Sequence, residues 1–215
     1  VQEGGTVVAW GRNDYGQVVA PLGLNNVGTI SGGFYHNLAL QKDGAVVAWG
    51  DNRYGQTNIP EEALSGVIGI AAGRYHNLAM KNDGAVVVWG RNDLGQRNIP
   101  SKENLGTVQA IATGAHHNLV LRSDGTVYAW GYNQNGQANV PAALASVDHA
   151  DFVRVTAIDG GALHSLALRA DGTVVAWGQN AYGQRNVPAA LKSADHPDFV
   201  KITNIAAGGY HNLAL

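Results

Sequence analysis

Five histidines recur along this chain at a regular interval and are its most evident candidates for chemistry: His36, His76, His117, His164 and His211. A row of imidazoles could hold a metal ion or act as acid–base groups. However, every one of them begins the same short apolar stretch and is followed by Asn or Ser. Equivalent positions of a repeat are kept apart by the repeats themselves. We therefore expect structural histidines whose ring nitrogens bond a neighbouring loop, with no metal and no cofactor.

The other side chains that could take part in catalysis or metal binding occur in simpler contexts. His149 with Asp151, and His196 with Asp198, lie in two similar inserts that we interpret as longer surface loops. Four aspartates precede glycine in turns, and one carboxylate per turn provides too few oxygens for calcium. The chain has no cysteine, no Gly-x-Ser-x-Gly turn and no phosphate-binding glycine loop. We therefore predict that the protein is not an enzyme.

The overall charge argues against two further classes of function. The 215 residues have a formal net charge of −2, and only 14% of them are charged. Nucleic-acid binding requires a clustered basic surface, which this composition does not provide. No apolar stretch reaches the length of a membrane span. We expect neither nucleic acid nor membrane insertion among the interactions of the chain.

The histidines belong to a longer repeat whose best-preserved part is AWGRNDYGQ at 9–17. Its near copies lie at 48–56, 88–96, 129–137 and 176–184. Successive copies are separated by 39 to 47 residues, and the spacing grows where the two inserts occur, at 146–153 and 193–200. A period of this length is typical of repeat architectures such as solenoids and propellers.

Each repeat predicts a small antiparallel sheet. In 36–49, two apolar stretches are joined by a turn that ends in Asp-Gly, which is a hairpin signal. The stretch TVVAWG is apolar on both alternating faces, so both faces must be covered. A further strand is expected before each histidine, at 27–33, 67–73, 108–114, 155–161 and 202–208. The segments 60–66 and 141–147 could form a turn of helix at most.

Short sheets that are apolar on both faces favour an all-β fold, a β-propeller of antiparallel blades with five sequence repeats. A flat solenoid is the alternative. We expect one domain, 1–215, with repeats at 1–39, 40–79, 80–120, 121–167 and 168–215. Pairing of HNLAL (211–215) with TVVAW (6–10) would close the ring and remove two sheet edges. The alternative is a segment of a longer array, in which an incomplete ring could self-associate.

The segment VVAWGDNRYGQTNIP, together with SGVIGIAAGRYHNLAMKNDG, spans 46–84 and resembles the repeat of the regulator of chromosome condensation family. It is most similar to the bacterial branch, which includes a secreted inhibitor of β-lactamase. The resemblance implies a propeller with four-stranded blades, commonly seven, whereas five repeats are present here. It also implies two kinds of activity. The nuclear branch promotes nucleotide exchange on a small GTPase through a wedge and a basic tail, for which this chain has no counterpart. The inhibitory branch binds an enzyme through loops and aromatic residues.

Positions that stay fixed between the repeats are expected to build the scaffold. Each Trp should fill the space between blades and donate its indole N–H to a fixed acceptor, and each Gln should hold its own loop. Three residue types are fixed in this way in all copies: Trp10, Trp49, Trp89, Trp130 and Trp177; the Gly after each Trp; and Gln17, Gln56, Gln96, Gln137 and Gln184.

Positions that vary between the repeats are expected to contact a partner. They form two strips, one just before each histidine and one just after each Trp-Gly, and both are rich in Tyr, Phe and Arg. The alternative for each Tyr is packing between blades. We predict that the contact residues are Phe34, Tyr35, Arg74, Tyr75, His116, Leu163 and Tyr210 in the first strip and Tyr15, Tyr54, Tyr132 and Tyr182 in the second.

These observations predict a non-enzymatic protein that binds a protein partner through its loops and inhibits an enzyme in this way. Two alternatives are a structural or assembly module of a larger exported protein and a nucleotide-exchange factor for a small GTPase. The resemblance to the inhibitory branch implies an extracellular or periplasmic location, with a cytoplasmic one as the alternative.

Overall fold

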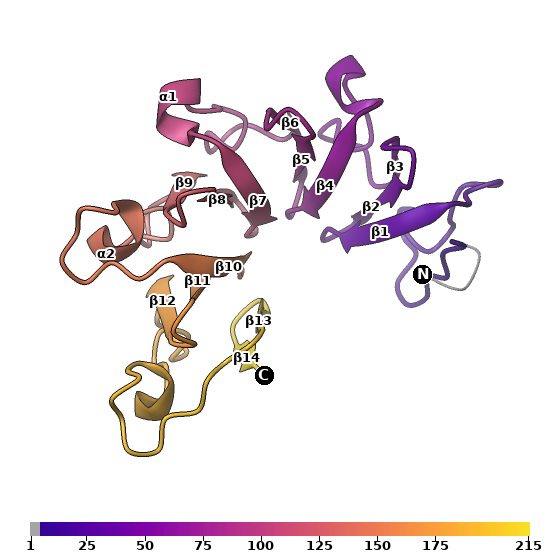
Figure 1. The fold of residues 1–215 in the computed structure, drawn as a ribbon. Coiled ribbons are helices and arrows are strands. Elements are labelled where there is room, and N and C mark those ends of the chain that lie inside the picture. Colours follow the sequence, from indigo (N-terminus) through magenta and orange to yellow (C-terminus); the bar gives the residue numbers. More distant parts are fainter. Residues whose placement is uncertain (1–4) are drawn as a thin grey trace. The chain divides into compact units, whose positions relative to one another are not determined.

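Short antiparallel sheets make up the protein, which was obtained as a computed structural model that describes residues 5–215. Four sheets contain three strands each, and a fifth contains two (Figure 1). In chain order the strands are β1 (Val27–Gly32), β2 (His36–Gln41), β3 (Val46–Gly50), β4 (Val67–Ala72), β5 (His76–Lys81), β6 (Val86–Gly90), β7 (Val108–Thr113), β8 (His117–Arg122), β9 (Val127–Gly131), β10 (Val155–Gly160), β11 (His164–Arg169), β12 (Val174–Gly178), β13 (Ile205–Ala207) and β14 (Asn212–Ala214). The all-β fold of blade-like sheets is the one that the repeat predicts.

Helical structure is confined to single turns, as the sequence predicts for 60–66 and 141–147. The four turns are η1 (Glu61–Ala63), α1 (Lys102–Leu105), α2 (Ala142–Ala145) and η2 (Ala189–Leu191). Each lies in the segment that connects one sheet to the next, and three of the four follow a proline directly. Each of these prolines is the N-cap residue, with an extended ψ, and its missing N–H has no helical partner to lose there.

The hairpins between the second and last strands of each sheet have the turn chemistry that Asp-Gly predicts. In the first of them, Gly44 has φ +86, and the Asp43 carboxylate accepts a hydrogen bond from the Ala45 amide at 3.1 Å. The strands on either side of this turn, β2 and β3, pair in register from Leu40 opposite Val46 to His36 opposite Gly50. The same register recurs in the other three complete sheets, so equivalent side chains occupy equivalent places in each.

The chain divides into two compact units, one that ends at Ile99 and one that covers Pro100–Leu215. In the first unit, the core includes Leu38, Val46 and Val67 with Trp89 from the next sheet. In the second unit, Leu119 and its neighbours pack with Trp177 in the same manner. Within each unit, apolar residues of one sheet are thus covered by the sheet that follows it. The expectation of one domain over 1–215 stays a prediction.

The fixed residues form a recurring polar scaffold. The indole of Trp89 donates to the carbonyl oxygen of Gln56 at 2.9 Å, and the Asn77 amide donates to the same oxygen at 2.7 Å. The Gln56 side chain accepts the amide N–H of Tyr54 at 2.9 Å and so holds its own loop. Both roles confirm what the sequence predicts for these residues. Trp49 and Trp177 repeat the indole bond, to the carbonyls of Gln17 and Gln137.

Two expectations for this scaffold are wrong. The histidines bond the next sheet and not a loop: the ring Nε2 of His36 lies 2.6 Å from Asn77 Oδ1, and that of His164 lies 2.7 Å from Asn212 Oδ1. Trp10, in contrast to the four other tryptophans, is not buried, because 84% of it is exposed. Residues 6–10 form no strand, and therefore no sheet covers this indole.

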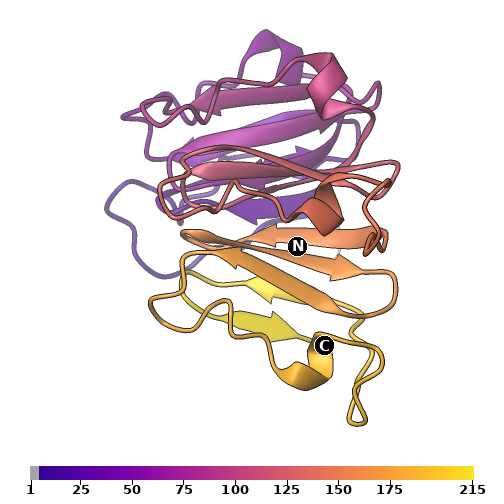
Figure 2. The same ribbon diagram turned by 90° about the vertical axis from the view of Figure 1, so that its left-hand side faces the viewer.

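The expected pairing of the first and last strands is also wrong. In the residues that the structure describes, β14 pairs with β13 alone, and no third strand joins this sheet. Figure 2 shows these two strands in yellow beside the orange strands of the preceding sheet, which they contact. Among the described residues, four sheets contain three strands and the fifth contains two, and none contains the four that the family resemblance implies.

Candidate protein-binding surface

The two variable strips of the sequence are brought together by the backbone of each sheet. The amide of Asp51, just after Trp-Gly, donates to the carbonyl of Tyr35, just before the histidine, at 2.9 Å. Arg91 donates to Tyr75 in the next sheet over the same distance. Both bonds extend the pairing of the last and second strands beyond their ends. Residues of the two strips are therefore neighbours in space, although they are about sixteen residues apart in the chain.

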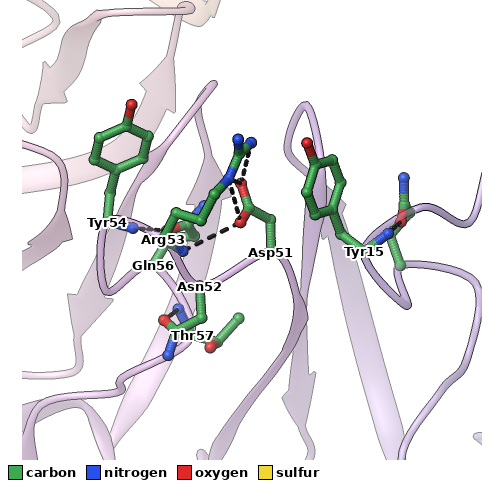
Figure 3. A network of polar contacts seen from close by, with 8 residues as sticks. Tyr15, Asp51, Asn52, Arg53, Tyr54, Gln56 and Thr57 are labelled. Atoms are coloured by element: carbon green, nitrogen blue, oxygen red, sulfur yellow. Dashed lines mark hydrogen bonds and ion pairs between the residues drawn. The ribbon is translucent and has the colours of Figure 1, made fainter.

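The loop after each Trp-Gly is held rigidly by its own side chains. In the second copy, the Asn52 side chain accepts the amide of Thr57 at 3.0 Å, and Gln56 accepts that of Tyr54 (Figure 3). Asn13, Asn92, Asn133 and Asn180 make the equivalent bond in the other copies. These loops therefore present their variable side chains from a fixed backbone, which lowers the entropy lost on binding.

Five aromatic rings of the first unit lie in contact with one another. Tyr35 is at their centre, and its ring centroid is 4.5 Å from Phe34, 5.0 Å from Tyr15 and 6.2 Å from Tyr75. Tyr54 continues the row at 5.0 Å from Tyr75. The tilted and edge-on orientations of these pairs are those that aromatic rings favour. Five of the predicted contact residues are thus brought together.

Four arginines lie over these rings. The guanidinium carbon of Arg53 is 4.5 Å from the centre of the Tyr15 ring, and that of Arg91 is 4.7 Å from the Tyr54 ring. Arg12 lies over Tyr35 at 5.5 Å. Arg74 lies over two further rings of the row. We call these nine residues the aromatic–arginine cluster: Arg12, Tyr15, Phe34, Tyr35, Arg53, Tyr54, Arg74, Tyr75 and Arg91.

Three of the arginines are also paired with a carboxylate two residues away in their own loop. The pairs are Arg12 with Asp14, Arg53 with Asp51, and Arg91 with Asp93. The order of charges is reversed in the second pair, where the carboxylate comes first and is buried (Figure 3). Its burial favours a higher pKa, but the hydrogen bonds and charge of Arg53 outweigh that effect and lower the pKa of Asp51.

Arg74 differs from the other arginines of the cluster. It forms no ion pair with any residue that the structure describes, and its guanidinium lies between Phe34, at 4.7 Å from the ring centre, and Tyr75, at 5.4 Å. Arg74, Phe34 and Tyr54 are exposed. The cluster therefore offers a partner one uncompensated cation beside exposed aromatic area.

The remaining predicted contact residues lie in the second unit and form two smaller groups. The rings of His116 and Tyr132 are 6.3 Å apart, and those of Tyr182 and Tyr210 are 5.2 Å apart. Leu163 is half-buried, and its carbonyl accepts the amide of Gln179. None of these groups contains an arginine within ring distance, in the part of the chain described.

The sequence interpretation named Arg74 as a contact and placed Arg12, Arg53 and Arg91 in the second variable strip, but did not include these three among the predicted contact residues. A signal for them was present, since Arg and Asp alternate at positions one and three after Trp-Gly in three consecutive copies. The buried state of Asp51 had no such signal, because exposed and buried aspartates look alike in a sequence.

No group of metal-ligating side chains accompanies the cluster in residues 5–215. No three His, Asp or Glu side chains of that range converge to hold a metal ion. The same range contains no helix that is long and apolar enough to span a membrane.

Comparisons with solved structures give the same fold at low sequence identity. Human WBSCR16 is 22% identical, with a TM-score of 0.73 over 95% of this chain and 65% of its own. Prp20p from Saccharomyces cerevisiae is 20% identical, with a TM-score of 0.71 over 86% of this chain and 55% of its own. The ectodomain of the receptor kinase CR4 from Physcomitrella patens is 22% identical, with a TM-score of 0.66 over 93% of this chain and 50% of its own.

The chain thus spans between half and two-thirds of the length of these proteins. A comparison with curated protein sequences gives no significant match. The sequence profile of the regulator of chromosome condensation (RCC1) repeat matches residues 29–56, 67–96, 108–137 and 155–184, which is more than half of the chain. These four segments each contain the Trp, Gly and Gln of the scaffold. The chain therefore belongs to the RCC1 repeat family.

Proposed function

We propose that the protein is a non-enzymatic binding protein that recognises a protein partner through the aromatic–arginine cluster. The observation that carries the proposal is the continuous contact of five aromatic rings and four guanidiniums across two sheets. Tyr and Arg are the residue types, with Trp, that contribute most to the free energy of protein–protein binding. Proteins of this repeat family are generally binding or exchange-factor proteins, which supports the same class of function.

The chemistry of the cluster indicates the kind of partner. Three of its arginines are neutralised by aspartates of their own loops, whereas Arg74 is not. A matching surface would therefore present an apolar or aromatic area that covers Phe34 and Tyr54, with a carboxylate positioned for Arg74. The ion pairs and the fixed loops hold the cluster in one conformation before binding, which favours affinity.

We further propose that binding blocks an enzyme of bacterial origin outside the cytoplasm, in the extracellular space or the periplasm. The resemblance of the repeat to the inhibitory branch supports this part of the proposal. It requires only that the cluster cover the entrance of an active site, and no catalytic residue of its own.

The test begins with the triple variant Phe34→Ala, Tyr54→Ala and Arg74→Ala. All three side chains are exposed, so the melting temperature should remain close to that of the wild type. The matched control is Tyr182→Ala with Tyr210→Ala, an exposed aromatic pair outside the cluster. Partners are captured from bacterial culture medium, identified and purified, and their Kd is measured by calorimetry.

We expect the triple variant to weaken binding by about 100-fold or more, equivalent to about 3 kcal/mol, and the control to leave it unchanged. Purified β-lactamases and other secreted bacterial enzymes are assayed for inhibition in parallel. Unchanged affinity of the triple variant contradicts the role of the cluster. Accelerated nucleotide release from a small GTPase, without inhibition of any enzyme, would favour the exchange function in place of this one.

A further inference from the structure

The second loop of the aromatic–arginine cluster has its charged pair in the reverse order. The loops after the first and third Trp-Gly read RND, at 12–14 and 91–93, whereas the second reads DNR, at 51–53. Apart from these two positions, 48–56 is identical to 9–17. The first and second loops therefore have the same composition and net charge, and they differ only in where the two charges stand.

The order of the pair decides which charge faces solvent. The side chain of Asp51 is 1% exposed, whereas those of Asp14 and Asp93 are 53% and 46% exposed. Arg53 keeps 51% of its side chain exposed. The outer loops thus present a carboxylate to a partner beside each guanidinium. The second loop presents a guanidinium alone, as the positive end of a dipole whose negative end is buried.

The buried carboxylate also fixes the direction of the Arg53 guanidinium. Arg53 Nε donates to Asp51 Oδ1 at 2.9 Å, Nη2 donates to Oδ2 at 3.0 Å, and the Arg53 amide donates to Oδ1 at 3.1 Å (Figure 3). A bidentate pair of this kind sets the plane of the guanidinium as well as its position. In the outer loops, Asp14 and Asp93 bond their arginines through a single oxygen. The Nη1 group of Arg53 takes part in none of these bonds and stays free to donate to a partner.

The fixed guanidinium lies in the middle of the cluster. Its carbon is 4.5 Å from the ring centre of Tyr15 in the preceding loop. The pKa of Arg53 is raised, chiefly by its hydrogen bond to Asp51, and charge interactions with Tyr15 and Tyr75 raise it further. Tyr75 is also the ring over which Arg74 lies, at 5.4 Å. Two exposed guanidiniums therefore lie near one ring, and neither has an exposed carboxylate of its own.

We propose that Asp51 and Arg53 determine the specificity of the cluster, by directing a second guanidinium beside Arg74 at the carboxylates of an acidic segment of the partner protein. Arg53 makes the contact, and Asp51 is the residue that positions it. The exposed carboxylates of Asp14 and Asp93 disfavour acidic groups over the outer loops, so the acidic segment faces the second loop. This inference rests on the proposed function and names the chemistry of the partner.

A charge swap within the second loop tests the inference with the fold held constant. Asp51→Arg with Arg53→Asp makes 48–56 identical to 9–17, a sequence that the chain already accommodates in its first loop. We therefore expect the melting temperature to stay close to that of the wild type. Asp51→Asn with Arg53→Gln is the second variant, which removes both charges at similar volume and does not leave one charge buried without its partner. Lys102→Glu with Glu103→Lys, at two exposed residues outside the cluster, is the matched control.

The probe is the synthetic peptide acetyl-Glu-Phe-Glu-Phe-amide, compared with the same peptide in which glutamine replaces glutamate. Binding to the full chain is followed by NMR of the arginine Nε–H signals. We expect the acidic peptide to bind the wild type with a Kd of about 1 mM, to shift the signals of Arg53 and Arg74, and to bind about tenfold tighter than the glutamine peptide. Both loop variants should weaken the acidic peptide about tenfold, and the control should leave its Kd unchanged.

Three results would overturn the inference. The first is equal affinity of the wild type for the two peptides, or no shift of the Arg53 signal at about 10 mM acidic peptide. The second is an unchanged Kd in both loop variants. The third is weaker binding in step with a lower melting temperature in both variants, which would assign Asp51 a structural role alone.

The peptide assay needs no captured partner, so its outcome is separate from the test of the proposed function. A captured partner that is lost with the triple variant, together with equal affinity for the two peptides, would keep the proposed function and remove this inference. A captured partner that the triple variant retains would remove the proposed function, whatever the peptides do.

Discussion

At the scale of single residues, the scaffold depends on one carbonyl oxygen per repeat. The Gln56 carbonyl accepts Asn77 and Trp89, and the Gln137 carbonyl accepts Ser165 and Trp177. Ser165 takes the place that Asn77 has in the earlier repeat, and its hydroxyl donates the equivalent hydrogen bond. The repeat therefore conserves a hydrogen bond and not a residue type.

This scaffold predicts a difference between two tryptophans of the same motif. Trp89→Phe keeps most of the buried apolar area but loses the indole donor to Gln56, and it should lower the free energy of unfolding by about 1–2 kcal/mol. Trp10→Phe should have no effect on dilute protein, because the Trp10 indole is exposed. Urea denaturation measures both. Equal losses for the two variants would contradict the role of the carbonyl.

The buried histidines predict a loss of stability at mildly acidic pH. Burial lowers the pKa of His36 below its ordinary value of about 6.5, although the bond to Asn77 and the charge of Asp51 oppose the shift. Its Nδ1 has no partner among the described residues, so a proton there would be unsatisfied. The pKa of His164 is lowered for the same main reason.

The sign of the effect follows from proton binding. Below about pH 6.5 the unfolded chain binds a proton at each of these histidines before the folded chain does, so the free energy of unfolding falls as pH decreases towards the folded-state pKa. His36→Gln keeps a side-chain donor for Asn77 but does not titrate. Urea denaturation between pH 7 and pH 5 should therefore show a shallower decline for this variant than for the wild type. If the free energy of unfolding declines equally in the variant and the wild type, His36 does not contribute to the pH dependence.

At the scale of elements, the hairpin turns share one backbone conformation but differ in their surroundings. Gly44 has φ +86 and Gly84 has φ +81. A Cβ on Gly44 would lie 3.1 Å from the Gly66 amide nitrogen, whereas a Cβ on Gly84 would meet nothing within 4 Å.

These turns therefore make a matched pair. Gly84→Ala should cost about 1 kcal/mol of stability, the penalty of a left-handed backbone for a residue with a Cβ. Gly44→Ala should cost more, because the crowded backbone of the next sheet adds to the same penalty. Thermal melts of the two variants measure the difference. A larger loss at Gly84 than at Gly44 would contradict the packing described for the first turn.

Most strands could be predicted from the sequence because their signals are local. An Asp-Gly turn between apolar stretches determines where β2 ends and β3 begins, and no distant residue is needed. The segment at 5–11 shows the limit of such reasoning. It is identical to 172–178, yet only the latter contains a strand, since only the latter has a second strand beside it. Whether a segment pairs with a neighbouring strand depends on the fold and not on its own seven residues.

The sequence likewise predicts which residues belong to the candidate site, but not which of them contact one another. Tyr15, Tyr35 and Tyr75 vary between repeats and were expected in loops, but their contact with each other arises from the packing of two sheets. The pairing of Arg53 with a buried Asp51 likewise depends on the depth of that loop position, which no pattern in the sequence records.

At the scale of the whole molecule, the sheets within each unit are stabilised chiefly by packing on the next sheet of that unit. Leu38→Ala removes a fully buried side chain that packs with Val67 and Trp89 of the following sheet, and should cost about 2–5 kcal/mol. Because stability in repeat proteins is a sum of neighbour terms, amide protection should fall most in β1–β6.

Hydrogen exchange followed by mass spectrometry measures that protection segment by segment. The converse variant, Leu166→Ala, lies in the second unit and should reduce protection in β10–β13 most, because Leu166 packs with Val174, Ile202 and Ile205. A uniform loss along the entire chain in both variants would show instead that the sheets unfold as one cooperative body.

The paired bonds on the glutamine carbonyls have an evolutionary consequence. The carbonyls of Gln17, Gln56 and Gln137 each accept two bonds from the sheet that follows, so a duplicated repeat inserted in the gene meets its neighbours with groups that already match. Lengthening the array demands no compensating mutation. Loops on a newly added copy are then free to diverge, and a new recognition surface can arise without any change in the architecture that holds it.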